Sequence, residues 1–598
     1  MAVYRSDQAQ LTFAAEAAQG ADMEMMEGSP VSSGASSTLN ATFAAGDRSI
    51  TVANGSSFLP GDFIRIGTVA GTVSQTVAAH EVRRIEFIDA PPSGNDRTFI
   101  LDRPLGFGHA TSQEVQEIVS IGGSSGTNDT NKYITFTPGV YETVDTPDPE
   151  MSIEGRRFLG TQSKRNWSVA YPGQQTLSGS ISDIMLLNGW PLRFPFGSVV
   201  TTPEDTTGST HTIATTAVVK GDIYITLSSV SGISIGDYIN IGLGSTSASE
   251  VRKVVGTPSG QTLKLNYPCQ FDHAIGVSVK EVDADYYTHE IHEKNDLDTV
   301  SWHVHMKESS ETAGKDFDRR YFGGMIGSAT LSAEEGEMLS MSWDSVNFLN
   351  FAHNQRNQIT LATGGSNAPQ AGDLYYAASI TANMPRFGLM QSIDTSDVGE
   401  PDKNDGTGFP STQPYYFSQG SLQFFGQEFA RVRSFSLSVS NGEEPRYYLG
   451  RQGNRARGPY EIKEGQREYS LSASVVLPDA TIESGANAAT AVQSGALELF
   501  RQLLLEGDFG GTTQATARTG LTMTLRFDRG VDDWIIIDVP GSATAGSPTA
   551  GSNALNSQGL FINTAPHTIG NDNPFQVDID AIFRSIKIRI RDTVPVYP

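Results

Sequence analysis

The chain contains two copies of one short sequence pattern, and this repeat constrains its fold more than any other feature. Residues 46–67 read GDRSITVANGSSFLPGDFIRIG, and residues 221–242 read GDIYITLSSVSGISIGDYINIG. In each copy the two Gly-Asp pairs are fifteen residues apart, Glu-Val-Arg follows, and a Pro, a Phe and a His-Ala pair close the copy at matched steps. Short apolar runs bounded by Gly, Pro and Asp are typical of strands, so the repeat predicts a small β module that occurs twice.

The Gly-Asp pairs predict turns, because Gly readily adopts positive φ and Asp accepts hydrogen bonds from backbone amides. We expect each copy to form a compact antiparallel barrel or sandwich of five or six strands. His109 and His273 recur at one position of the repeat. We interpret them as turn residues whose imidazoles bond a backbone carbonyl.

Both copies interrupt a larger host domain. The expected division is an N-terminal arm and linker (1–38), the first module (39–121), the first host part (122–208), the second module (209–282) and the second host part (283–598). The second host part contains a long polar loop at about 352–413. Loops of that length inside a domain usually make contacts or carry function.

The host segments predict a mainly β fold with a flanking helix. Phe435, Leu437 and Val439 alternate with serines, which is typical of a half-buried strand. Apolar residues of 490–507 gather on one helical face, and we also expect a short helix within 181–190.

The composition limits the classes of function. Asp and Glu exceed Lys and Arg by 67 to 42, giving a net charge of −25. That balance argues against a general affinity for nucleic-acid phosphate. The single cysteine, Cys269, excludes a disulfide within the chain and is interpreted as a small buried apolar residue. We see no secretory signal in MAVYRSDQAQ and no apolar run of membrane-spanning length, so we expect folding in a cytoplasm.

Four histidines offer a possible metal site, namely His289, His292, His303 and His305. Neutral imidazole suits zinc or nickel, and such a site would suggest a metal-dependent hydrolase. The order H-E-I-H differs from the H-E-x-x-H of metalloproteases, however. A polar strand face without a ligand is the simpler interpretation.

Other charged groups also have simpler interpretations. Glu334-Glu335 and Glu443-Glu444 could serve as glycosidase carboxylates, but solvated turns explain both pairs more simply. A basic cluster of Arg451, Arg455 and Arg457 could bind phosphate, pair with acidic residues of a partner subunit, or be solvated. We therefore expect no enzyme activity, no cofactor and no metal.

With the two modules set aside, the chain resembles the major tail tube proteins of long-tailed, siphovirus-type bacteriophages. The resemblance covers about 1–25, 132–205 and 283–598. Its most characteristic segments are AVYRSDQAQLTFAAEAAQG, the SG-containing segment of 154–197, RRYFGGMIGSATLSAEEGEMLSMSWDSVNF, FARVRSFSLSVSNGEEPRYYLG and GPYEIKEGQR. The two modules and the long loop depart from the family pattern.

The resemblance implies a host domain of two packed antiparallel sheets with a flanking helix. It further implies that six copies close into a ring and that rings stack into a tube for DNA ejection. The implied partners are further copies of the chain, other tail proteins at the tube ends, and the tape-measure protein followed by genomic DNA in the lumen. We expect assembly in the host cytoplasm, a final place in the virion tail and no membrane insertion.

Residues that we expect to contact neighbouring copies lie in the arm, the basic cluster and the last strand. They are Tyr4, Arg5, Arg451, Arg455, Arg457, Ile586, Ile588 and Ile590. An acidic bore would let DNA slide without binding. The alternative function is a tail-tip or fibre-like adhesin whose β modules bind host glycan.

Overall fold

The computed structural model consists almost entirely of strands, which confirms the predicted mainly β fold. It describes residues 4–16, 35–67, 81–121, 135–156, 169–308, 317–353, 413–448, 458–476, 523–539 and 560–598, apart from short gaps inside these ranges, together with residues 19, 386 and 387. The helix predicted at 490–507 and nearly all of the long loop at 352–413 lie outside the described residues.

The larger of two main sheets has fourteen strands. Its main path runs β10 (Thr143–Asp145), β12 (Val169–Met185), β23 (Ser340–Asn347), β22 (Phe317–Glu334), β28 (Val432–Ser440), β31 (Glu468–Val476), β36 (Gln576–Phe583) and β34 (Leu560–Thr564). Attached to this path are β1 (Tyr4–Ala15), β9 (Thr135–Phe136), β11 (Pro149–Arg156), β21 (Val300–Glu308), β24 (Asn350–His353) and β35 (His567–Thr568). All pairs in this sheet are antiparallel.

A seven-stranded antiparallel sheet packs against the large one. Its order is β13 (Gly197–Pro203), β20 (Tyr287–Glu293), β37 (Lys587–Asp592), β33 (Asp533–Val539), β32 (Met523–Gly530), β26 (Gly420–Phe424) and β27 (Gln427–Glu428). Both sheets contribute alternate residues to one core, including the predicted Phe435, Leu437 and Val439. Phe13 lies at its aromatic centre, with ring centroids 5.5 Å from Trp302 and 5.4 Å from Trp343.

The short helix predicted within 181–190 is wrong, because β12 continues to Met185. Ile181 and Ile184 are three residues apart, yet they face residues of β23 that are only two apart. The extra residue forms a β-bulge, at which Asp183 has φ 54°. The bulge gives two buried isoleucines the spacing of a helix face, and this produced the misleading pattern.

The two copies of the repeat form six-stranded sheets with the same connectivity. The first module contains β2 (Ser36–Thr38), β7 (Glu114–Glu117), β4 (Phe63–Ile66), β5 (Glu81–Asp89), β6 (Arg97–Leu101) and β3 (Ser49–Val52), in that spatial order. The second contains β14 (Thr210–Thr212), β19 (Ser278–Val282), β16 (Tyr238–Ile241), β17 (Glu250–Ser259), β18 (Thr262–Leu265) and β15 (Tyr224–Thr226). Each module has its own apolar cluster.

The Gly-Asp pairs form turns of one kind in both modules. Each Asp carboxylate accepts a hydrogen bond from the backbone amide three residues earlier, at 2.6–2.9 Å, in Asp47, Asp62, Asp222 and Asp237. This local bond explains why the pattern repeats.

The imidazoles of the two repeated histidines contact side chains, and these side chains differ between the modules. His109 contacts the Gln113 side-chain oxygen, and His273 contacts the Glu250 carboxylate, both at 2.8 Å. The backbone amides of the two histidines do bond carbonyls, those of Phe43 and Val218. The shared feature of the two positions is therefore the backbone bond rather than the ring partner.

The remaining described elements are short. They are the helical segments η1 (Gly55–Ser57), η3 (Trp190–Leu192), α2 (Arg193–Phe196) and η4 (Phe417–Gln419), and the two-stranded pairs β8 (Ser120–Ile121) with β25 (Arg386–Phe387) and β29 (Glu444–Arg446) with β30 (Glu461–Lys463). In the described part of the chain, no helix is long and apolar enough to span a membrane.

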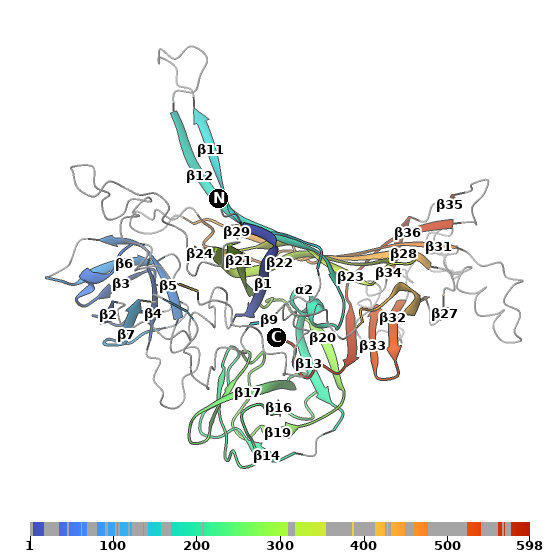
Figure 1. Cartoon of the computed structure of the whole chain (residues 1–598), viewed down its shortest axis with the longest axis horizontal. Coiled ribbons are helices and arrows are strands. Elements are labelled where there is room, and N and C mark those ends of the chain that lie inside the picture. The colour runs from blue at the N-terminus through green and yellow to red at the C-terminus, as the bar shows by residue number, and fades with distance from the viewer. Residues whose placement is uncertain are drawn as a thin grey trace, which may run out of the picture.

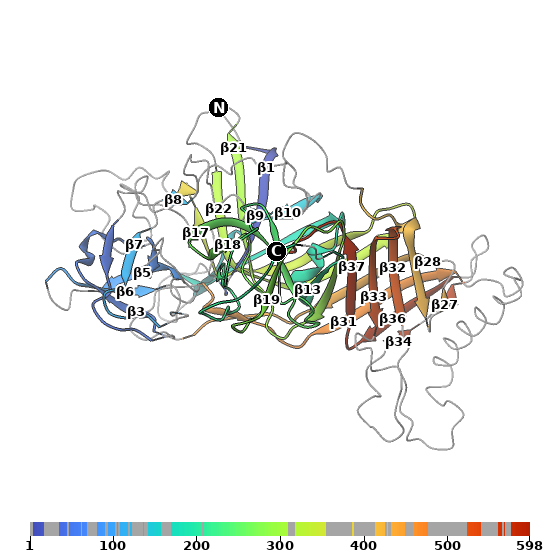
Figure 2. The same ribbon diagram turned by 90° about the horizontal axis from the view of Figure 1, so that it is seen from below.

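Figure 1 shows the large sheet nearly edge-on, with the seven-stranded sheet and the second module on one side of it. The first module lies beyond one end of the large sheet (Figures 1 and 2). The hairpin of β11 and β12 projects away from the body on the side opposite the second module (Figure 1). One face of the large sheet is therefore left uncovered by the other described sheets.

Candidate functional site

Hydroxyl side chains cover that uncovered face. Because side chains alternate along a strand, the residues between the core positions of β22, β23, β28, β31 and β36 all point away from the core. Fourteen of them align in three cross-strand rows: Ser342, Thr330, Ser438, Ser470 and Ile582; Ser340, Ser332, Ser436, Ser472 and Asp580; and Glu334, Ser434, Ser474 and Asp578. We call these three rows the serine face.

The only charges in the three rows are negative. Glu334, Asp578 and Asp580 carry carboxylates, and none of these described row positions is a Lys or Arg. Asp344 adds a fourth carboxylate beside the first row, where it accepts a 2.7 Å hydrogen bond from the Thr330 hydroxyl. The three rows are thus polar and anionic, and their described positions offer no cation to a phosphate group. The exposed Arg433, at the irregularity of β28 beside the third row, lies 3.5 Å from the Glu335 carboxylate.

The outer face of the seven-stranded sheet has a different character. Basic residues alternate along β37, and each lies beside an acidic residue on a neighbouring element. The ion pairs are Lys587–Glu290 at 3.2 Å, Arg589–Asp538 at 2.7 Å and Arg591–Asp532 at 2.8 Å. The three described rows of the serine face therefore lack the Lys and Arg that β37 presents on the other outer face.

A partly buried carboxyl group lies at one end of the serine face. Glu443 follows β28, and its Oε1 accepts hydrogen bonds from the Ser345 hydroxyl (3.0 Å) and the Asn347 amide (2.5 Å). Burial raises the pKa of Glu443 to about 8. We expected Glu443 and Glu444 to lie in a solvated turn, but Glu443 is partly buried, and the exposed Glu444 begins strand β29.

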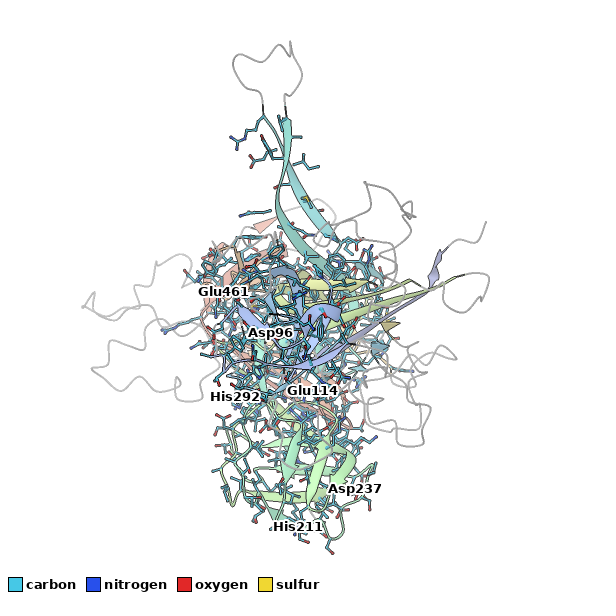
Figure 3. The ribbon with its side chains drawn as sticks, turned by 90° about the vertical axis from the view of Figure 1, so that its left-hand side faces the viewer. Asp96, Glu114, His211, Asp237, His292 and Glu461 are labelled. Atoms are coloured by element: carbon cyan, nitrogen blue, oxygen red, sulfur yellow. The ribbon has the colours of Figure 1, made fainter. Side chains whose placement is uncertain are left out.

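The β11–β12 hairpin carries several exposed apolar side chains. The exposed fractions of Ile153 and Tyr171 are 67% and 50%, and Met151 and Val169 are also exposed. Figure 3 shows this hairpin standing clear of the body. An isolated two-stranded hairpin is marginally stable in water, and a group of exposed apolar side chains is typical of a contact surface.

The four candidate metal ligands lie on strands of different sheets: β20 carries His289 and His292, and β21 carries His303 and His305. Both ring nitrogens of the buried His289 contact oxygens, the Thr201 hydroxyl at 2.9 Å and the Val594 carbonyl at 2.8 Å. Within the described ranges, no three His, Cys, Asp or Glu residues are grouped to hold a metal ion.

The residues expected to contact neighbouring copies have varied positions. Tyr4 and Arg5 begin β1, which pairs with β21 of the same chain. Arg451, Arg455 and Arg457 lie outside the described residues. Ile586, Ile588 and Ile590 are buried in the chain's own core, and β37 has a strand on each side. Their roles in assembly stay predictions.

The sequence predicted the individual strands of the serine face but did not identify the face itself. The signal was present in serines that alternate with apolar residues, as in SFSLSVS and SLSAS. Only the strand order aligns these separate runs into one surface.

Residues 357–580 match the family model described as phage tail tube protein. The match covers less than half of the chain, and it includes β28, β31 and the first part of β36, which form the middle of the serine face. No curated protein matches the chain significantly. The family match supports a structural role in a phage tail tube, with assembly into the virion tail together with further copies and other tail proteins.

Proposed function

We propose that this chain assembles into stacked rings that form the tube of a siphovirus-type phage tail, with the serine face lining the bore. The observation that carries the proposal is the absence of Lys and Arg from the described rows of that face. Ring symmetry is proposed as sixfold from the family resemblance. The tube conducts the genome from the virion into the host.

A bore for DNA must contact a polyanion over a long distance without retaining it. Affinity for DNA depends on Lys and Arg that displace counterions from phosphate. Serine hydroxyls provide a wetted surface, and the carboxylates of Glu334, Asp578 and Asp580 repel phosphate. The ion-paired face of the seven-stranded sheet suits the outside of the tube, where cations do not meet the genome.

Ring closure uses sheet edges. At the two ends of the described large sheet lie β34 and the strands β10 and β11. An open sheet edge is a template for another strand, and a closed ring removes such edges. The exposed apolar residues of the β11–β12 hairpin provide further contact with a neighbouring copy, where a partner covers them.

The proposed partners are further copies, other tail proteins at the tube ends, the tape-measure protein and then DNA in the bore, bound without sequence specificity. Assembly takes place in the host cytoplasm, and the two modules decorate the outside of the tube.

Cysteine accessibility tests which face lines the bore. Cys269 is buried and burial raises its thiol pKa well above the usual value, so the wild-type chain provides an unreactive background. Two conservative variants are compared in assembled particles, Ser472→Cys on the serine face and Ser421→Cys on the outer face of β26. A small maleimide should label both, and a polyethylene-glycol maleimide wider than the bore should label only Ser421→Cys.

Two results would contradict the proposal. Equal labelling of Ser472→Cys by the large reagent would place the serine face outside. Electron microscopy showing only isolated trimers or density at a tail tip, without stacked rings, would favour the glycan-binding adhesin.

A further inference from the structure

The edge of β13 is covered by the second module of the same chain. β13 is the last strand of the seven-stranded sheet and pairs only with β20 in the described structure. An end strand normally leaves alternate backbone groups open. Yet every residue of β13 except Thr202 is buried.

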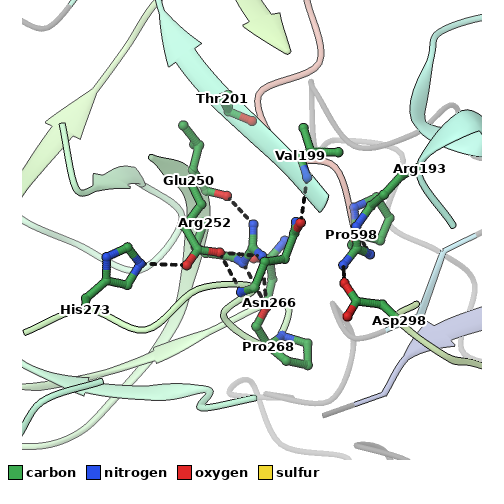
Figure 4. Close-up of polar contacts among 12 residues, drawn as sticks. Arg193, Val199, Thr201, Glu250, Arg252, Asn266, Pro268, His273, Asp298 and Pro598 are labelled. Carbon is green, nitrogen blue, oxygen red and sulfur yellow. Dashed lines mark hydrogen bonds and ion pairs between the residues drawn. The ribbon is translucent and has the colours of Figure 1, made fainter. Parts of the chain in front are cut away.

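Side chains and backbone of the second module bond the outward-facing groups of β13 directly. The Val199 amide donates to the Gln270 side-chain oxygen at 2.9 Å, and the Thr201 amide donates to the Ser249 carbonyl at 2.9 Å. The Thr201 carbonyl accepts from the Ser249 hydroxyl (2.8 Å) and the Asn240 amide group (3.3 Å). Figure 4 shows the Val199 contact beside Thr201.

These strand-facing groups are held in place by a buried ionic cluster. The Glu250 carboxylate accepts from the Gln270 backbone amide (2.9 Å) and contacts Arg252 (2.7 Å) and His273 (2.8 Å). Asn240 and Ser249 also bond each other at 2.9 Å. The cluster is fully buried, so its side chains have one arrangement rather than many.

A second contact joins the module to the host domain beside this cluster. Lys220 of the module lies 2.7 Å from the Asp298 carboxylate. The same carboxylate pairs with the buried Arg193 at 2.7 Å (Figure 4). These cations hold the pKa of Asp298 well below its usual range. The module is thus fixed to the host by hydrogen bonds and by an ion pair.

The two modules share the supporting residues but differ at the strand-facing positions. Glu250, Arg252 and His273 have identical counterparts in the first module, namely Glu81, Arg83 and His109. The strand-facing Asn240, Ser249 and Gln270 correspond instead to Arg65, His80 and Gly106. An arginine side chain is too long to reproduce the hydrogen bond that the Asn240 side-chain amide donates to the Thr201 carbonyl. A glycine has no side-chain oxygen to accept the hydrogen bond from the Val199 amide. The difference lies at the positions that touch β13.

We propose that Asn240, Ser249 and Gln270 form a strand-edge-binding site whose ligand is the backbone edge of β13. By occupying that edge, the second module prevents a second copy of the chain from adding a strand there. Addition of further copies is thereby confined to other sheet edges. The inference concerns the single chain and does not depend on ring assembly.

The test uses a double variant of the full chain, Asn240→Arg with Gln270→Gly. It replaces two strand-facing residues of the second module by their counterparts in the first module. Hydrogen exchange of peptides covering 197–203 should become at least tenfold faster, because two bonds to the edge are lost. Sedimentation should show new, irregular oligomers. Adding Thr201→Pro should suppress them, since proline removes an outward donor from the edge.

The matched control is the reciprocal change in the first module, Arg65→Asn with Gly106→Gln, which should leave β13 exchange unchanged. Unaltered exchange at 197–203 in the first variant would overturn the proposed site. Faster exchange without new oligomers would overturn the blocking role. If peptides from β28 also exchange faster, the variant has unfolded more widely, and the milder Gln270→Ala is then used instead. Gln270→Ala should speed hydrogen exchange only in the β13 peptide. Unchanged exchange of that peptide in Gln270→Ala would also overturn the proposed site.

Discussion

Replacing Glu443 by glutamine should abolish a specific loss of stability that develops as the pH rises from 4.5 to about 8. The carboxyl group accepts hydrogen bonds from Ser345 and Asn347, and a Cβ at Gly327 would lie only 2.1 Å from its Oε1. Glycine at 327 thus provides the space in which the carboxyl group is buried. Burial disfavours the charged form, which is why the pKa rises from 4.5 to about 8.

The sign and size of the effect follow from this shift. Below about pH 4 the carboxyl group of Glu443 is neutral in both the folded and the unfolded chain, and its contribution to stability is fully present. As the pH rises towards about 8, the unfolded chain ionises first, so folding loses stability. At 1.36 kcal/mol per pH unit the shift gives a ceiling of about 5 kcal/mol, and partial exposure to water reduces the expected loss to about 2–3 kcal/mol.

Glutamine keeps the shape of the side chain without its charge. Thermal unfolding midpoints of wild type and Glu443→Gln should agree near about pH 5, and the variant should be more stable near about pH 9. Local hydrogen exchange in β23 should show the same crossover, which separates this site from unfolding elsewhere in a large chain.

The neighbouring Glu444 provides the control, because it is exposed. Glu444→Gln should follow the wild-type pH profile. Parallel pH profiles for Glu443→Gln and wild type would refute the reasoning, since they would mean that Glu443 ionises as freely in the folded chain as in the unfolded one.

Two further predictions concern other contacts. Arg193→Met should lower the free energy of unfolding by about 3–5 kcal/mol, because it leaves the buried Asp298 without its main partner. Lys220→Met removes a half-exposed partner of Asp298 and should lower the free energy of unfolding by less than about 1 kcal/mol. Similar shifts in the thermal midpoints of the two variants would contradict this ranking. Ile153→Ser on the projecting hairpin should weaken self-association in sedimentation and leave the thermal midpoint of the dissociated chain unchanged. Unchanged association would show that the hairpin is not a contact surface.

Local patterns in the sequence predicted strands well where alternation was regular. Phe435, Leu437 and Val439 face the core as predicted, and the Gly-Asp pairs form the expected turns. The pattern misled at 181–190, because a bulge imitates helical spacing and bulges depend on the partner strand.

The candidate site required information that lies between strands rather than along them. The serine face arises from runs of sequence more than two hundred residues apart, and only their pairing order aligns them. The burial of Glu443 depends on Gly327 and β23, which are distant in the sequence. Side chains that match distant partners leave little local signal, and this is why a solvated turn was predicted there.

The position of the second module has a practical consequence. The module connects β13 to β20, and these strands are direct antiparallel neighbours, with Pro203 opposite Tyr287. Its two ends therefore leave the host about one interstrand spacing, roughly 5 Å, apart. A foreign domain whose termini are adjacent can be grafted at this junction as cargo, provided that it brings its own acceptor for the Val199 amide.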